Sequence, residues 1–386
     1  PLAFVGRFDE DEKRRRRWEE VWEENASGAS STCRLYLDEI LASSLKRLGS
    51  SQYQVKRQGA AALAGLAVAA PDVVTGAGKV PAILDALLKE LPGRVWEGKE
   101  SLLPGVADVV EKCPEASGTF GGETVIAALV AEASRKKSSY REAALSALQR
   151  SLTALAPPGG TKETSPVCDF FPVAFPLIRD VLSPGGGSDA DGASGDASAA
   201  ARKDQSPAND ADGGVGGNTI REMEEEAHRK ASEAKAGGAV AERALECLAS
   251  LCAGAGDAAS LAAAAPAVAS FAGDAIDPSA PWTRRAAGLR VVKSLSTRCG
   301  QLNVSGIEAW LDPLRESMGS CANDPKVSQL RSVAAEALGA STRALGSVGT
   351  CPTRDAFVKK LEEMRDGDRA PDVRGAAHRS LADALS

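Results

Sequence analysis

The sequence predicts an all-α protein built as a solenoid, in which pairs of helices stack in one direction. Three observations predict this fold. Helix-like segments recur at a nearly constant spacing, apolar residues within them follow the helical period, and no run alternates between apolar and polar residues as a strand does. The chain has 386 residues, of which 43% are hydrophobic and only 4% aromatic. So few aromatic side chains suit flat packing between helices better than a compact globular core.

The repeat is visible in a basic residue near the start of the second helix of each pair. These anchor residues are separated by 42, 42, 102, 42, 46 and 43 residues. All but one spacing fall in the range of about 40–47 residues that is typical of HEAT and armadillo units. The spacing therefore predicts about seven HEAT-like helix pairs. The anchors are Arg57, Lys99, Arg141, Arg243, Arg285, Arg331 and Arg374.

The first helix of each pair is expected between two anchors. In the earliest of these segments Ile40, Leu41, Leu45 and Leu48 recur at helical spacing and form one apolar stripe. Prolines inside or near the start of several first helices are expected to bend them. The predicted first helices span residues 35–48, 80–91, 122–134, 168–182, 258–272, 305–318 and 353–365.

The turns before the second helices have a matching chemistry. Asp324 precedes Pro325, and Asp372 follows Pro371. Each Asp is expected to accept hydrogen bonds from free backbone N–H groups, while each Pro fits the first turn of a helix. Trp96 and Trp282 are expected to begin second helices and to be at least half buried between repeats.

Composition divides the chain into segments. Residues 183–219 contain nine Gly and six Asp and almost no large aliphatic side chain. They cannot bury enough apolar surface to offset their ordering entropy, so a disordered insertion is predicted. A charged helix is expected at 220–236, and together the two segments account for the long spacing. Residues 1–32 are predicted to form a charged helical segment, and 33–182 and 237–386 HEAT-like repeats.

Charge and cysteine usage exclude several classes of protein. A net charge of −6 argues against bulk binding of nucleic acid or anionic membrane. The eight cysteines are sparse and include no Cys-x-x-Cys, which favours reduced thiols in the cytosol or nucleus. With only His228 and His378 available, most zinc sites and most His-based catalysis are excluded. No apolar stretch approaches about 20 residues, so no transmembrane segment is expected.

Two local motifs have a structural and a functional interpretation. The segment Thr75–Lys79 resembles a phosphate-binding loop, but it lacks the leading Gly and the Ser or Thr after the Lys, so a plain loop is predicted. The basic run Lys13–Arg17 could be a nuclear import signal. A solvated helix with opposite charges at i,i+4 is the favoured interpretation.

No residue pattern points to catalysis. An enzyme with Cys33 or Cys113 as nucleophile is the alternative considered, but such a thiol needs a lowered pKa and a nearby base. We therefore assign no catalytic, cofactor-binding or metal-binding residue and predict that the chain is not an enzyme.

One part of the chain is more specific than the generic repeat. Four blocks occur in order: Val21–Asn25, Arg34–Ile40, Lys56–Ala61 and Gly93–Leu103. They resemble the C-terminal part of the proteasome adapter and scaffold family, which are very large HEAT-repeat proteins. The resemblance covers residues 18–180, whereas 240–386 fit only as further HEAT units. It implies that the chain, which begins at Pro1, is a piece of a far longer protein.

The resemblance implies a non-enzymatic scaffold. Such a protein binds core and regulatory-particle subunits of the proteasome, helps hold the two particles together, and takes part in ubiquitin-dependent and endoplasmic-reticulum-associated degradation (the ERAD pathway). It also implies links to motors and vesicles, and a location in the cytoplasm and nucleus with association at the endoplasmic reticulum or endosomes. The alternative is an unrelated HEAT or armadillo adaptor, such as a transport receptor or phosphatase scaffold, which would not explain blocks Arg34–Ile40 and Gly93–Leu103.

Overall fold

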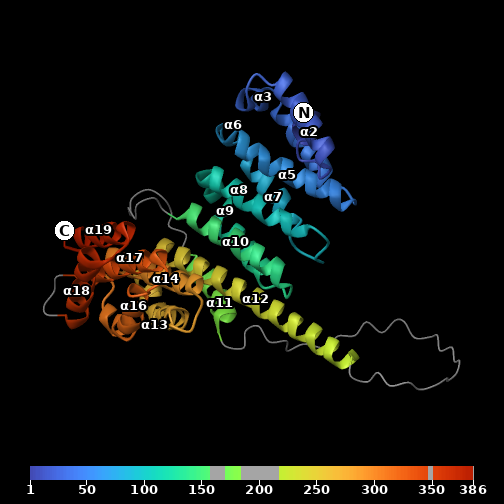
Figure 1. The fold of residues 1–386 in the computed structure, drawn as a ribbon. Helices are drawn as coiled ribbons and strands as arrows, with labels where there is room; N and C mark the ends of the chain where they lie inside the picture. Colours follow the sequence, from blue (N-terminus) through green and yellow to red (C-terminus); the bar gives the residue numbers. More distant parts are fainter. Residues whose placement is uncertain (157–169, 184–216, 347–350, 386) are drawn as a thin grey trace, which may run out of the picture.

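The described helices form a two-layered array that runs in one direction from the N-terminus to the C-terminus (Figure 1). The computed structural model describes residues 1–156, 170–183, 217–346 and 351–385. Within these ranges every regular element is a helix. The predicted all-α solenoid is thereby confirmed. Most of the predicted disordered insertion, and Cys168 at the start of one predicted helix, lie outside the described residues.

The elements follow one another with short connections. They are α1 (Leu2–Gly6), α2 (Glu12–Asn25), α3 (Ala29–Leu35), α4 (Leu37–Leu48), α5 (Tyr53–Ala69), α6 (Pro71–Gly76), α7 (Val80–Lys89), η1 (Lys99–Ser101), α8 (Leu102–Lys112), α9 (Pro114–Ala133), α10 (Ser138–Leu155), α11 (Phe171–Leu182), α12 (Gly217–Gly254), α13 (Ala258–Ala275), α14 (Trp282–Gln301), α15 (Ile307–Leu311), η3 (Asp312–Leu314), α16 (Arg315–Ala322), α17 (Ser328–Leu345), α18 (Pro352–Gly367) and α19 (Pro371–Leu385).

The second helices form one continuous layer. In this layer α5, α8, α10, α12, α14, α17 and α19 each pack against the next. The first helices α7, α9, α11, α13, the broken helix α15–η3–α16, and α18 form the other layer. Within the described residues, the helices of 35–110 make no extensive contact with those of 325–386, so each repeat is stabilised by its neighbours.

Several first helices are bent where the sequence predicts it. Pro176 lies inside α11 and Pro266 inside α13, and the helix that contains Pro313 is broken into three short pieces. In α9 the bend has another cause, because Gly121 has a φ of 131°, outside the helical region. Proline removes an N–H donor and clashes with the preceding turn, which explains the breaks at the other positions.

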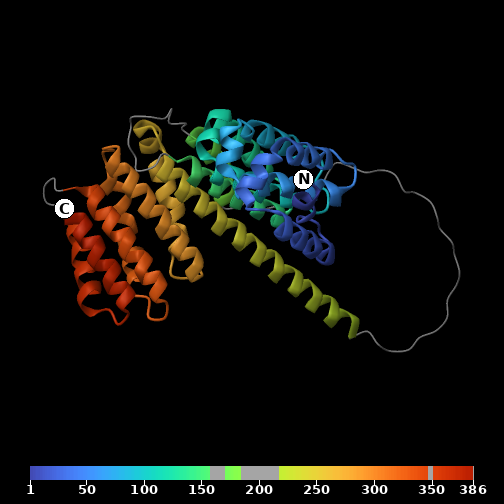
Figure 2. The same cartoon turned by 90° about the horizontal axis from the view of Figure 1, so that it is seen from above.

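Helix α12 differs from the expected arrangement. The charged helix expected at 220–236 lies within one helix of 38 residues, which continues into the repeat and ends at Gly254. The pair Gly237 and Gly238 lies inside it, with no atom near enough to hinder a helical backbone. Glycine lowers helix propensity without forbidding helical angles, so the pair does not end the helix. In both views the N-terminal half of α12 projects beyond the array (Figures 1 and 2).

The two tryptophans expected at helix starts behave differently. Trp282 begins α14 and is 41% exposed, so it is more than half buried as predicted. Trp96 is partly buried but precedes the helix, since η1 begins at Lys99 and α8 at Leu102. Gly98 adopts a left-handed conformation with φ of 85°, which delays the helix start.

The N-terminal segment contains the helix expected there. Asp11 caps α2 by accepting a hydrogen bond from the backbone N–H of Arg14. Trp22 is buried and meets the ring of Phe4 edge-on, with centroids 5.3 Å apart. A Cβ on Gly6 would overlap the ring of Trp18, so only glycine allows this approach. Aromatic packing therefore fixes α2 on α1.

Arginines of the second helices tie each repeat to the turn of the next. Arg285 on α14 forms an ion pair of 3.0 Å with Asp324, which lies before α17. On α17, Arg331 donates two hydrogen bonds, of 2.8 and 3.0 Å, to the carboxylate of Asp368 before α19, and a third, of 2.8 Å, to the carbonyl of Asp324. Arg374 repeats the contact to the carbonyl of Asp368. The anchors that reveal the period therefore connect successive repeats.

The acceptor at the last turn is a different residue from the one expected. Asp324 accepts hydrogen bonds from the backbone N–H groups of Lys326 and Val327, as predicted. At the next turn this role belongs to Asp368, which accepts from the N–H of Ala370, and not to Asp372. Asp372 follows the proline, so it lies inside the first turn of α19.

We expect Asp368→Asn to lower the free energy of unfolding by about 2 kcal/mol, because Arg331 loses a largely buried, charged partner. Hydrogen bonding from Arg331 lowers the pKa of Asp368. Its stabilisation is therefore complete above the unfolded carboxyl pKa of about 3.9 and is lost as the pH falls below it. The difference from wild type should be constant at neutral pH and shrink below about pH 4 in urea titrations.

The matched control is Asp366→Asn. Asp366 also pairs with an arginine, Arg365 at 2.7 Å, but both side chains are largely exposed. Exposed pairs contribute little, so this variant should unfold like wild type. Equal effects of the two substitutions would contradict the role assigned to Asp368.

Candidate interaction surface

Two of the sequence blocks that carry the family resemblance meet on the surface between α5 and α8. The block Lys56–Ala61 lies on α5, and the block Gly93–Leu103 forms the loop before α8. Tyr53 at the start of α5 stacks on Trp96 of the loop, with ring centroids 4.8 Å apart and an interplanar angle of 7°. Tyr53 is 52% exposed. The pair thus presents aromatic surface to solvent at the junction of two repeats.

Arg57 holds the loop and the N-terminal segment together. Its Nη1 donates to the carbonyl of Glu97 over 2.7 Å, and its Nη2 donates to Glu10 over 2.6 Å. These hydrogen bonds from Glu10 raise the pKa of Arg57. One turn away, Lys56 pairs with Glu90 at the start of the loop. Cations of α5 therefore fasten the residues on either side of Trp96.

The loop itself is shaped by a buried lysine and two glycines. The side chain of Lys99 is fully buried, and its Nζ donates to the carbonyl of Pro92 over 3.2 Å. Gly93 and Gly98 have φ values of 83° and 85°, which only glycine adopts without strain. A Cβ on Gly98 would overlap the guanidinium of Arg57. Glycine at this position is what allows Arg57 to reach the loop.

A buried polar cluster lies under the loop. The hydroxyl of Tyr140 donates to Glu132 over 2.7 Å, and Arg135 forms an ion pair of 2.8 Å with the same carboxylate. Burial and the hydrogen bond to Glu132 raise the pKa of Tyr140, while burial lowers the pKa of Lys99. These groups bond to one another and hold neighbouring elements in register, because unpaired polar groups would be costly in the interior.

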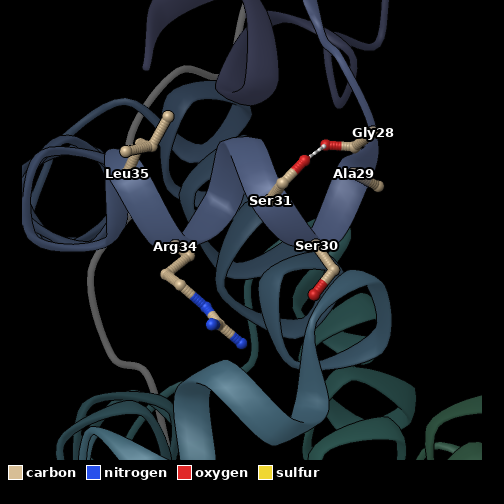
Figure 3. A pocket seen from close by; sticks show the side chains of 6 residues that line it. All are labelled: Gly28, Ala29, Ser30, Ser31, Arg34 and Leu35. Atoms are coloured by element: carbon tan, nitrogen blue, oxygen red, sulfur yellow. Dashed lines mark hydrogen bonds between the residues drawn. The ribbon is translucent and has the colours of Figure 1, made fainter.

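A second surface feature is a shallow, open hollow beside α3 (Figure 3). It is lined by Gly28, Ala29, Ser30, Ser31, Arg34 and Leu35. Ser31 donates its hydroxyl proton to the carbonyl of Gly28 over 3.1 Å, so this polar group is already satisfied. Leu35 is 73% exposed. The hollow offers apolar contact area and one cation, and it gathers no acid–base pair.

The two local motifs take structural roles. The segment Thr75–Lys79 forms the turn between α6 and α7, and Lys79 pairs with Asp38 at 2.8 Å. The basic run Lys13–Arg17 lies on α2, as the favoured interpretation expects. On α2 one pair at i,i+4 forms, between Glu12 and Arg16.

The cysteines considered as nucleophiles are buried. Cys33 and Cys113 are at most 3% exposed, and burial raises the pKa of Cys33. Burial also raises the pKa values of Cys247 and Cys252, and that of Cys299 to about 11. Raised pKa values favour the unreactive thiol, so these side chains behave as small apolar residues of the core.

Neither a metal site nor an isolated membrane helix stands out in the described part of the chain. There, no three His, Cys, Asp or Glu side chains lie close enough to hold a metal ion. One helix in that part, α13, is long and apolar enough to cross a membrane. It packs against α14 as the first helix of a repeat, and a core helix has the same composition.

The arrangement is suited to binding rather than to reaction. Exposed Tyr and Trp side chains beside Arg are the residue types that dominate protein–protein interfaces. A loop fixed by Arg57, Lys56 and Lys99 loses little conformational entropy when a partner covers it. The aromatic pair Tyr53–Trp96 is therefore the candidate interaction surface, and the sequence analysis anticipated Trp96 but not its partner Tyr53.

Comparison with known proteins supports the family resemblance. No protein-family model matches the chain. Over 193 residues, or 46% of the chain, it is 34% identical to the human proteasome adapter and scaffold protein ECM29, of which it covers 10%. Over 142 residues, or 36% of the chain, it is 26% identical to the proteasome component ECM29 of Saccharomyces cerevisiae, of which it covers 8%. The chain thus matches about a tenth of the length of these relatives, and the predicted resemblance is confirmed.

Solved structures support the fold. A structure of Kap95p with RanGDP matches 99% of the chain with a TM-score of 0.67 and 15% identity, over 40% of its own length. The Kap95:Nup1 complex matches the whole chain with a TM-score of 0.59 and 12% identity, over 45% of its length. Kap121p bound to Pho4p matches 99%, with a TM-score of 0.55 and 16% identity, over 36% of its length. At these identities the similarity concerns the solenoid fold alone.

We expect Arg57→Ala to release the loop before α8. Without the hydrogen bond to the carbonyl of Glu97, backbone amides of residues 94–101 should exchange with solvent about tenfold faster, measured by hydrogen–deuterium exchange. The control is Arg94→Ala in the same loop, since Arg94 is exposed and has no ion-pair partner in the described structure. Equal exchange in both variants would show that Arg57 does not hold the loop.

Proposed function

We propose that this chain, a relative of the proteasome adapter and scaffold proteins, is a non-enzymatic HEAT-repeat adaptor that binds the proteasome. The observation that carries the proposal is the 34% identity to the human adapter over 193 residues. A two-layered solenoid offers a long, regular surface to other proteins, which fits a scaffold. The absence of an acid–base or nucleophilic cluster from the described surface agrees with this role.

The finer parts of the proposal follow from the family. They are contact with both core and regulatory particles, stabilisation of their association, and participation in ubiquitin-dependent degradation, including the ERAD pathway. We place the protein in the cytoplasm and nucleus, with association at the endoplasmic reticulum or endosomes and links to motor or vesicle proteins. Neither nucleic acid nor a cofactor belongs to this role.

The alternative of a transport receptor or phosphatase scaffold has weaker support. The Kap95p and Kap121p structures share 12–16% identity with the chain, which is evidence for the fold alone. The proteasome relatives share recognisable sequence in addition.

The test is affinity purification of the protein that carries this chain. We expect core and regulatory-particle subunits to be recovered in amounts that exceed those from an untagged control. Recovery of neither particle would contradict the proposed function.

The same assay tests the aromatic pair. Trp96→Ala should weaken binding of purified proteasomes about tenfold, because a partly buried aromatic anchor is lost from a fixed loop. Trp282→Ala is the matched control, since Trp282 is also a half-exposed tryptophan near the start of a second helix. If both variants bind like wild type, the aromatic pair is not a contact, while the proposed function stands.

A further inference from the structure

Helix α2 carries a straight stripe of exposed charges that the fold does not use. Lys13, Arg17, Glu20 and Glu24 follow one another at i, i+4, i+7 and i+11, so at 100° per residue they lie within about 60° of each other. All four side chains are exposed, and none has an ion-pair partner in the part of the chain that the structure describes. Along the helix the stripe has two positive charges followed by two negative ones.

This order of charges is unfavourable for the helix itself. The helix macrodipole favours acidic residues in the first turn and basic residues in the last, and here the order is reversed. Lys13 and Arg17 repel each other at i,i+4, and so do Glu20 and Glu24. The stripe therefore contributes nothing to the stability of α2 in the isolated chain.

The opposite face holds α2 in place. Trp18 packs on Gly6, and Trp22 packs on Phe4, so the helix is fixed by aromatic contacts about half a turn away from the stripe. Helix α2 lies at the N-terminal end of the array, where it packs chiefly on α1 (Figure 1). The stripe is thus presented on a rigid element at an accessible end of the molecule.

The stripe is complementary to itself. If a second copy of α2 lies antiparallel along the first, Lys13 faces Glu24 of the second copy and Arg17 faces Glu20. The two-fold axis repeats both contacts, so every charge of the stripe meets an opposite charge. A closed two-fold interface requires this kind of self-complementary patch. We propose that α2 is an antiparallel self-association surface through which two copies of this chain pair.

Other partners suit the stripe less well. A nucleic acid or an anionic membrane would be attracted by Lys13 and Arg17 but repelled by the acidic half. An acidic protein segment would meet the same repulsion. The helix is 14 residues long, or about 21 Å, so the interface belongs to the small, transient class. Exposed ion pairs are screened by salt, so pairing should be weak and salt-sensitive.

The geometry provides a specific test. A carbodiimide joins a lysine to a carboxylate only when the two are in direct contact. Within one helix Lys13 and Glu24 are about 16 Å apart, so a Lys13–Glu24 link can form only between two copies. We would cross-link an equal mixture of ¹⁴N- and ¹⁵N-labelled chain at 0.1 M salt and search for mixed-isotope Lys13–Glu24 peptides by mass spectrometry.

We expect this link at 0.1 M salt and at least a tenfold lower yield at 1 M, where the screening length falls from about 10 Å to about 3 Å. The intrachain pair Lys56–Glu90 is the internal control, because a partly buried ion pair should react at both salt concentrations. If Lys56–Glu90 links while Lys13–Glu24 never does, the proposal is overturned.

Charge-reversal variants test the pairing independently of cross-linking. Lys13→Glu with Arg17→Glu makes the stripe uniformly negative, and Glu20→Lys with Glu24→Lys makes it uniformly positive. Each double variant alone should sediment as a monomer, whereas their equal mixture should recover a weight-average mass above that of the monomer. Trp18 and Trp22 are retained, and circular dichroism checks that α2 remains folded.

A matched control reverses charge elsewhere. Lys136→Glu with Lys137→Glu changes two exposed lysines before α10 and should leave self-association unchanged. Failure of the mixed variants to associate would overturn the proposal, as would equal loss in the control. So would wild-type chain that stays monomeric but binds duplex DNA or anionic vesicles through Lys13 and Arg17.

Discussion

The contact between an arginine of one repeat and the turn of the next is the constraint on which the array depends. Arg331 reaches backward to the carbonyl of Asp324 and forward to the carboxylate of Asp368, so one side chain fixes two turns. The contact can form only if the turns lie one repeat apart, which explains why insertions are not tolerated evenly along the chain. Arg57 uses the same geometry near the N-terminus, where its partners are the carbonyl of Glu97 and the carboxylate of Glu10.

Much of the fold follows from the sequence because the repeat is periodic. The anchors, the apolar stripes and the turn prolines each report the same spacing, so helix pairs and their order could be predicted. Boundaries were less accessible. Neither the late start of α8 nor the continuity of α12 could be predicted, because the first depends on Gly98 and Arg57 from another repeat, and the second on space around Gly237.

The candidate surface was only partly predictable for a similar reason. The blocks Lys56–Ala61 and Gly93–Leu103 stand out in the sequence, yet nothing in their spacing shows that Tyr53 stacks on Trp96. The contact joins residues that are one repeat apart and depends on the angle between successive helix pairs. A search for aromatic residues at equivalent positions of neighbouring repeats would have found the pair. The buried cluster around Glu132 would still have been missed, since its members resemble ordinary surface charges.

The unbroken course of α12 has a mechanical consequence. Residues from Val240 onward are packed between α10 and α14, while roughly 23 residues extend ahead of them, a length of about 35 Å. A straight rod held at one end acts as a lever. A tilt of about 5° in the packed portion would move the free tip by about 3 Å, so small changes in the curvature of the solenoid are amplified at a point far from the repeats that produce them.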